Sequence, residues 1–189
     1  MRPERLNALT DGVVAIVLTI MVLELRFPEE PTLPAVLTVQ PLVAAYLLAF
    51  IYVAIYWNNH HHMMQAASRV TGRVLWANNA LLFWITLFPL MIRWIDEAGV
   101  TPWPVASFGL VLAGAAATYL VLERALIAAE GDESRVKRAV RAGGKEWISL
   151  AAYLIAIMAA FVSPYVSIAI YVSVAIVWLV PDRRFERQS

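Results

Sequence analysis

Long apolar runs alternate with short polar connections along the whole chain. A bilayer core is crossed by roughly 20 apolar helical residues. Runs of this kind lie near residues 8–27, 35–59, 74–95, 103–128, 147–163 and 165–181. Prolines, glycines and clustered charges separate them, and these residues end helices. The pattern predicts an all-α, polytopic membrane protein in which residues 1–189 form a single domain of six transmembrane helices.

The final apolar stretch needs its own interpretation. Residues 147–180 are nearly all apolar and too long for one comfortable span. Ser163 and Pro164 divide the stretch, which favours a hairpin of two short helices. One kinked helix and a re-entrant pair are the alternatives. A second proline, Pro89, is expected to kink the third span near its outer end.

Basic residues gather in alternate connections. The N-terminal segment, the 69–73 connection, the 130–145 connection and the C-terminal tail are rich in Lys and Arg, whereas the other connections are acidic or neutral. Excess positive charge marks the cytoplasmic side of a membrane protein. We therefore expect both termini in the cytoplasm and a multi-pass protein of the plasma membrane or cell inner membrane.

Composition narrows the function classes further. The chain is 61% hydrophobic and 15% charged, against about 45–50% and about 25% in soluble domains. It contains no cysteine, which excludes disulfides, thiolate metal sites and cysteine nucleophiles. A net charge of +1 argues against a nucleic-acid partner. Walker, HExxH and GxSxG motifs are absent from the sequence, so we expect no enzyme.

The first span carries polar side chains that a lipid anchor does not need. Thr19 belongs to a helical stripe that is otherwise apolar. The residues of this stripe follow the spacing i, i+3, i+4, i+7: Ile16, Thr19, Ile20 and Leu23. Asp11 lies about 140° around the helix from Ile16 and therefore faces away from the stripe, toward neighbouring helices. The alternative is an N-cap at Thr10 and Asp11, although Pro3 suits an earlier helix start.

The second span ends in a polar segment, WNNHHHMMQ, at residues 57–65. Three successive histidines, His60 to His62, point about 100° apart on a helix and cannot all face one ion. We therefore expect no metal site, and at least one histidine in the interior. Asn78 and Asn79 open the third span at the same depth. The topology predicts a polar cluster where the first three helices meet near the cytoplasm.

Three segments carry a family resemblance. RLNALTD at residues 5–11 looks like an R-x-x-x-F-S-D signature, with Leu9 and Thr10 replacing the Phe and Ser. WNNHH at residues 57–61 looks like a W-x-x-H segment, and Trp76, Asn78 and the later Pro89 fit a third-helix pattern. In these segments, and in its six-span layout, the chain resembles prokaryotic members of the transmembrane protein 175 family of potassium channels.

The resemblance implies a homotetramer with a central pore lined by the first helix, and potassium as the permeant ion rather than a bound cofactor. It implies that Ile16 forms the pore constriction, that Thr19 contributes to potassium selectivity, and that Leu23 forms another hydrophobic ring, with Ile20 on the same stripe. Six residues would join the first three helices in a polar network: Arg5, Thr10, Asp11, Trp57, His60 and Asn78.

The expected function is therefore a potassium-selective cation channel that conducts K+ passively through a hydrophobically constricted pore. Apolar constrictions gate by dewetting, while a ring of hydroxyls offers weak ion coordination. Glu24 would lie at the outer mouth and raise the local cation concentration. Two alternatives are a non-conducting helical bundle, in which the stripe is ordinary core, and a secondary transporter, for which inverted repeats are not visible.

Overall fold

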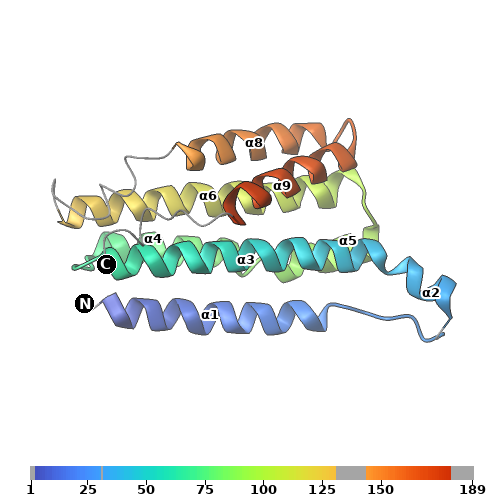
Figure 1. Cartoon of the computed structure of the whole chain (residues 1–189), viewed down its shortest axis with the longest axis horizontal. Coiled ribbons are helices and arrows are strands. Elements are labelled where there is room, and N and C mark those ends of the chain that lie inside the picture. The colour runs from blue at the N-terminus through green and yellow to red at the C-terminus, as the bar shows by residue number, and fades with distance from the viewer. Residues whose placement is uncertain (1–2, 31, 131–143, 180–189) are drawn as a thin grey trace.

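The computed structural model describes residues 3–30, 32–130 and 144–179, which form α-helices joined by short connections (Figure 1). The helices are α1 Pro3–Leu23, α2 Leu33–Thr38, α3 Gln40–Ala66, α4 Gly72–Ile85, α5 Phe88–Ala98, α6 Pro102–Glu130, α8 Lys145–Ala159 and α9 Pro164–Leu179. The all-α prediction is confirmed for these residues.

Proline sets many of the helix starts. Helices α1, α6 and α9 begin at Pro3, Pro102 and Pro164, and α2, α3 and α5 each have a proline in their first two positions. The first turn of a helix tolerates proline because its amide has no intrahelical partner there. The early start at Pro3 places Asp11 well inside α1, so the alternative of an N-cap at Thr10 and Asp11 is wrong.

The expected break near Pro89 is confirmed. The predicted third span consists of α4 and α5, which are interrupted at Thr86 and Leu87. Proline at position 89 cannot donate a hydrogen bond to the preceding turn. At the far end of α5, Gly99 adopts a φ of 71°, a left-handed conformation that ends the helix before the turn into α6.

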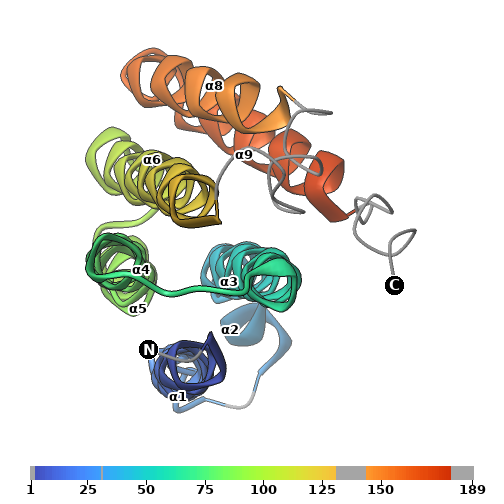
Figure 2. The same cartoon turned by 90° about the vertical axis from the view of Figure 1, so that its left-hand side faces the viewer.

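The long helices run up and down along one common direction (Figure 1). α1 leads away from the N-terminus, α3 returns, α4 and α5 lead away again, and α6 returns. Viewed along this direction in Figure 2, α1 lies at one edge of the bundle and α8 and α9 lie at the other, with α3 and α6 between them.

Among the described residues, four segments are long and apolar enough to cross a membrane: Pro3–Leu23, Gln40–Ala66, Gly72–Ala98 and Pro102–Glu130. Helices α8 and α9 contain 15 and 16 residues, or roughly 23 Å of helix each, against a hydrocarbon core of about 30 Å. They form a hairpin through Ala160–Ser163, so the alternative of one kinked helix is wrong.

Aromatic side chains fasten this hairpin to the rest of the bundle. Tyr52 of α3 donates its hydroxyl hydrogen to the carbonyl of Tyr171 at 2.7 Å, and Tyr171 donates to the carbonyl of Val105 at 3.2 Å. Ser167 closes the hairpin by donating to the Ala156 carbonyl at 2.6 Å. Because all these hydroxyls are buried and bonded, they stabilise the packing of α9 against α3 and α6.

Candidate functional site on the first helix

Helix α1 has two faces of different environment. Its buried positions follow spacings of three or four residues, which form a single stripe: Leu6, Thr10, Val14, Val17 and Met21. This stripe packs against α3, α4 and α5. Val13 and Leu18 beside the stripe are partly buried against the core. The exposed residues of α1 form the face that the subunit's other helices leave uncovered, in agreement with the place of α1 at the edge of the bundle in Figure 2.

The predicted stripe lies on the uncovered face. The exposed fraction is 59% for Ile16, 42% for Ile20 and 77% for Leu23, and Thr19 is exposed as well. The hydroxyl of Thr19 donates to the carbonyl of Ile16 at 2.8 Å. Since a hydroxyl carries one hydrogen and two lone pairs, this bond uses the donor and leaves the oxygen free to accept.

The buried face carries a chain of hydrogen bonds across three helices. Nε2 of His60 on α3 lies 2.8 Å from Oδ1 of Asn78 on α4, and Nδ2 of Asn78 donates to the Thr10 hydroxyl at 3.2 Å. Thr10 in turn donates to the carbonyl of Leu6 at 3.1 Å. Asn78 is fully buried, and His60 and Thr10 are each 1% exposed. A buried amide thus fixes the position of α1 against α3 and α4.

The direction of this chain assigns the histidine tautomer. Because the Asn78 amide nitrogen donates to Thr10, its oxygen accepts, and Nε2 of His60 must carry the hydrogen. The other ring nitrogen, Nδ1, is buried without a hydrogen-bond partner in the described structure. A second hydrogen on Nδ1 would have no acceptor, so this geometry suits the neutral imidazole.

A second connection joins α1 to α3. The indole nitrogen of Trp57 donates to Oδ1 of Asp11 at 2.7 Å. Asn7 donates to Oδ2 of the same carboxylate at 3.2 Å. Asn7 was not among the predicted site residues, although its position one helical turn before Asp11 is the signal that would have found it.

The structure does not bring every predicted residue into this network. Arg5 is exposed and, within the described residues, forms no hydrogen bond or ion pair with Asp11, His60 or Asn78. Glu24 follows the end of α1 and lies within electrostatic range of Arg93, which forms a salt bridge with Glu97 at 2.9 Å.

The side chains of the three successive histidines point in different directions, as expected for a helix. His60 points inward, whereas His61 contacts Gln65 at 2.8 Å and stacks on Trp57. Among the described residues, no group of three or more His, Cys, Asp or Glu side chains is arranged to hold a metal ion.

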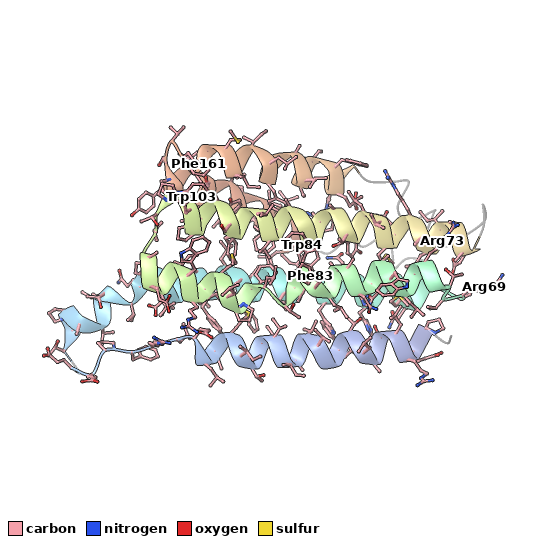
Figure 3. All side chains as sticks on the ribbon, turned by 180° about the vertical axis from the view of Figure 1, so that it is seen from behind. Arg69, Arg73, Phe83, Trp84, Trp103 and Phe161 are labelled. Carbon is pink, nitrogen blue, oxygen red and sulfur yellow. The ribbon has the colours of Figure 1, made fainter. Side chains whose placement is uncertain are left out.

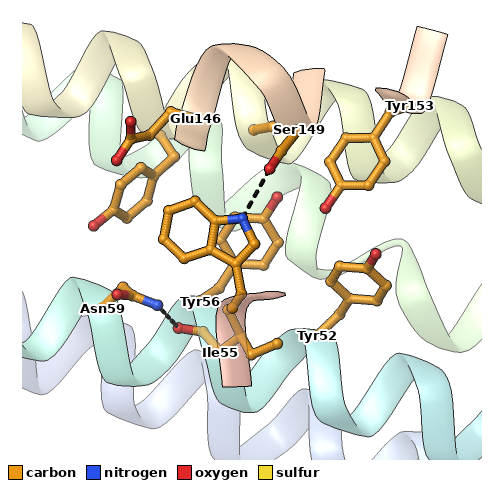
Figure 4. Close-up of a pocket in the computed structure, with 10 residues that line it drawn as sticks. Tyr52, Ile55, Tyr56, Asn59, Glu146, Ser149 and Tyr153 are labelled. Atoms are coloured by element: carbon orange, nitrogen blue, oxygen red, sulfur yellow. Dashed lines mark hydrogen bonds between the residues drawn. The ribbon is translucent and has the colours of Figure 1, made fainter. Parts of the chain in front are cut away.

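A small cavity of about 30 Å³ lies on the opposite side of α3 from α1 (Figure 4). Its walls include Tyr52, Tyr56 and Tyr153, and Trp178 donates to the Ser149 hydroxyl across it at 2.8 Å. Because α3 separates this cavity from the exposed stripe of α1, the cavity is not part of the candidate site.

Comparisons with known proteins show the family to which the chain is similar. A family described as the endosomal/lysosomal potassium channel TMEM175 matches residues 5–89, the segment that contains α1, α3, α4 and the start of α5. A protein of a Chryseobacterium species named as a potassium channel is 44% identical over 183 residues, which are 97% of this chain and 95% of the relative. A Chamaesiphon minutus protein named as a potassium channel is 29% identical over 104 residues, 52% of this chain and 51% of the relative.

The fold matches a solved structure over nearly its whole length. The crystal structure of a lysosomal potassium-selective channel TMEM175 homolog from Chamaesiphon minutus superposes with a TM-score of 0.79 at 23% sequence identity, covering 95% of this chain and 97% of that one. Family membership also confirms the prediction that the protein is not an enzyme, since the family consists of channels. By its match to the family and its similarity to a relative over almost its full length, the chain belongs to the TMEM175 family of potassium channels.

Proposed function

We propose that the protein is a potassium-selective cation channel whose pore is formed by the α1 helices of four identical subunits. One observation carries the proposal: α1 presents an exposed apolar stripe with one hydroxyl, while its opposite face is fixed by buried hydrogen bonds. Lipid can cover the apolar residues of such a stripe, but the hydroxyl among them favours a polar path. Copies of the stripe around an axis would provide one.

The proposed pore follows from the residues on the stripe. Four copies each of Ile16, Ile20 and Leu23 would give a narrow apolar passage, which closes to ions by dewetting. Four Thr19 oxygens would lie among them. Because each Thr19 hydrogen is directed to the Ile16 carbonyl, the oxygen lone pairs are available to a cation from which water has been partly removed. Thr19 is therefore our candidate for potassium selectivity.

We further propose that the chain spans the membrane six times, with α8 and α9 as the short fifth and sixth spans. The alternation of helix direction in Figure 1 supports this layout. The ends of α3 and α6 and the starts of α1 and α4 lie together at one end of the bundle. That end borders the basic connections of the sequence, which makes it cytoplasmic in the plasma membrane or cell inner membrane.

The remaining predicted residues have accessory roles in this proposal. Glu24 lies at the outer mouth, where its charge attracts cations and is partly balanced by Arg93. Arg5 lies exposed at the cytoplasmic end, where a neighbouring subunit is its available partner. Potassium is the permeant ion, and we propose no bound cofactor.

The proposal is tested with purified full-length protein in liposomes and planar bilayers. We expect a native mass of four subunits, passive potassium flux, and a bi-ionic potassium/sodium reversal potential displaced toward the potassium equilibrium. A monomeric mass without flux would favour a non-conducting bundle. Saturable counterflow with four-subunit mass would instead favour a secondary transporter, and a zero bi-ionic potential would contradict selectivity.

A further inference from the structure

A wide groove separates the first half of α4 from the last part of α6. Its volume is about 950 Å³. The residues that line it are Thr71, Gly72, Arg73, Trp76, Ala77, Ala80, Val121, Ala125, Ala128 and Ala129. Figure 3 shows this side of the molecule, with Arg69 and Arg73 at the end where α4 begins and Trp84 between the two helices farther along.

The groove exists because its floor is built from alanines, whose side chains leave the space between the two helices unfilled. It ends where Trp84 packs directly against Gly114, since a Cβ atom on Gly114 would lie 2.3 Å from the indole ring. On α4 the lining extends to Ala80, and from Arg73 to Ala80 the helix rises about 10 Å. One leaflet of a hydrocarbon core about 30 Å thick is about 15 Å deep, so the groove is long enough for the part of an acyl chain next to its headgroup.

The open end of the groove carries a positive charge, whereas its floor is apolar. Arg73 is exposed, and no carboxylate among the described residues forms a salt bridge with it. Glu130 is the last residue of α6, and its carboxylate accepts a hydrogen bond from the backbone nitrogen of Ser68. Trp76 is 77% exposed beside the arginine, in the position that indole rings favour at a membrane surface.

We propose that this groove binds an anionic glycerophospholipid, with the phosphate at Arg73 and one acyl chain along the alanine floor. Charge complementarity selects the headgroup, because an arginine without a salt bridge among the described residues favours a phosphate with a net negative charge. The apolar lining selects the acyl chain. The first turn of α4 has no side-chain cap, so its backbone N–H groups add to the attraction for the phosphate. The site goes beyond the proposed conduction and requires only that the protein lies in a membrane.

The experiment is native mass spectrometry of the purified full-length protein, titrated separately with palmitoyl-oleoyl phosphatidylglycerol and with the matching phosphatidylcholine. We expect tighter binding of phosphatidylglycerol. Arg73→Gln should weaken that binding about fivefold, the size expected for one basic side chain at an anionic surface. It should weaken phosphatidylcholine binding less, because the choline cation offsets the phosphate charge. Arg93→Gln, which removes an exposed arginine at the opposite end of the same predicted span, should change neither.

The acyl chain is tested by filling the groove. Ala128→Leu enlarges an exposed alanine of the lining and should weaken binding of both lipids, whereas Ala151→Leu on the exposed face of α8 should not. Equal affinity of the two lipids for the wild type, or an unchanged affinity in either Arg73→Gln or Ala128→Leu, would overturn the proposal. A change of oligomeric mass in Ala128→Leu without loss of lipid would show a subunit interface instead.

Discussion

Trp57 of α3 donates its indole hydrogen to Oδ1 of Asp11 on α1 at 2.7 Å, and within the described residues this is the one hydrogen bond from another helix to a carboxylate of α1. The acceptor is charged, so the bond is stronger than one between neutral groups. Both side chains are partly exposed, which moderates its contribution. The bond nevertheless fixes the rotation of α1 about its axis, and that rotation decides which residues face away from the bundle.

Asp11→Asn should therefore weaken assembly while leaving ion discrimination intact. The substitution keeps an acceptor for Trp57 but removes the charge, at a cost of about 1 kcal/mol per subunit. We expect a lower melting temperature and a smaller tetramer fraction by size-exclusion chromatography with light scattering. Asn7→Ala, which removes only a bond within α1, should have the smaller effect. Lost selectivity with normal assembly would contradict the placement of Asp11.

Asn78→Leu should destabilise the protein strongly, because it leaves the buried His60 nitrogen and Thr10 hydroxyl without their partner. The expected loss in free energy of unfolding is about 3 kcal/mol, from one to two unsatisfied buried groups. Thermal unfolding followed by circular dichroism measures it. The matched control is Asn79→Leu, since Asn79 is exposed. Equal losses in the two variants would remove the bridging role of Asn78.

Ile16→Asn should raise basal potassium flux. A polar side chain at the proposed constriction lowers the cost of wetting the pore, so the closed state becomes less favourable. Flux into liposomes at matched protein density measures the effect. Ile155→Asn is the control, because Ile155 is exposed to a similar extent and belongs to α8, the helix at the opposite edge of the bundle from α1 in Figure 2. Unchanged flux in Ile16→Asn would show that this residue does not line the pore.

Thr19→Val should reduce discrimination between potassium and sodium, because valine keeps the shape of the side chain and removes the oxygen. Each tenfold fall in the permeability ratio moves the bi-ionic reversal potential by about 59 mV for a monovalent ion. Thr19→Ser restores the hydroxyl and should retain most of the selectivity. The same reversal potential in the valine variant and the wild type would assign selectivity to another residue.

The helices themselves were predictable because their causes are local. Apolar length predicts the long helices, and proline predicts the break between α4 and α5. The ends were less accurate: α3 continues to Ala66, although its apolar run stops near residue 59. The polar residues that follow find partners within α3, as His61 does with Gln65, or on another helix, as His60 does with Asn78. Hydropathy alone takes no account of such partners, and it therefore places the end of α3 too early.

The choice between neighbouring polar residues was not predictable from the residue pattern, and only the family resemblance selected Asn78. Asn78 and Asn79 are chemically identical and adjacent, yet only Asn78 is buried. Which of the two faces α1 depends on the rotation of α4, which is set by packing against α6 and by Trp84 at Gly114. The stripe on α1 was easier to predict, because Ile16 and Leu23 differ from Asp11 in polarity and their spacing divides the helix into two faces.

The polar contacts of α1 are all near its first half. Beyond Asp11, within the described residues, its side chains form no hydrogen bond with another helix, and the contacts of Val14, Val17 and Met21 with the bundle are apolar. Hydrogen bonds thus hold the N-terminal half of α1, while its C-terminal half can shift against the neighbouring helices without breaking a hydrogen bond. In the proposed tetramer, a small tilt of α1 about Asp11 would change the pore diameter least near Asp11 and most at Leu23.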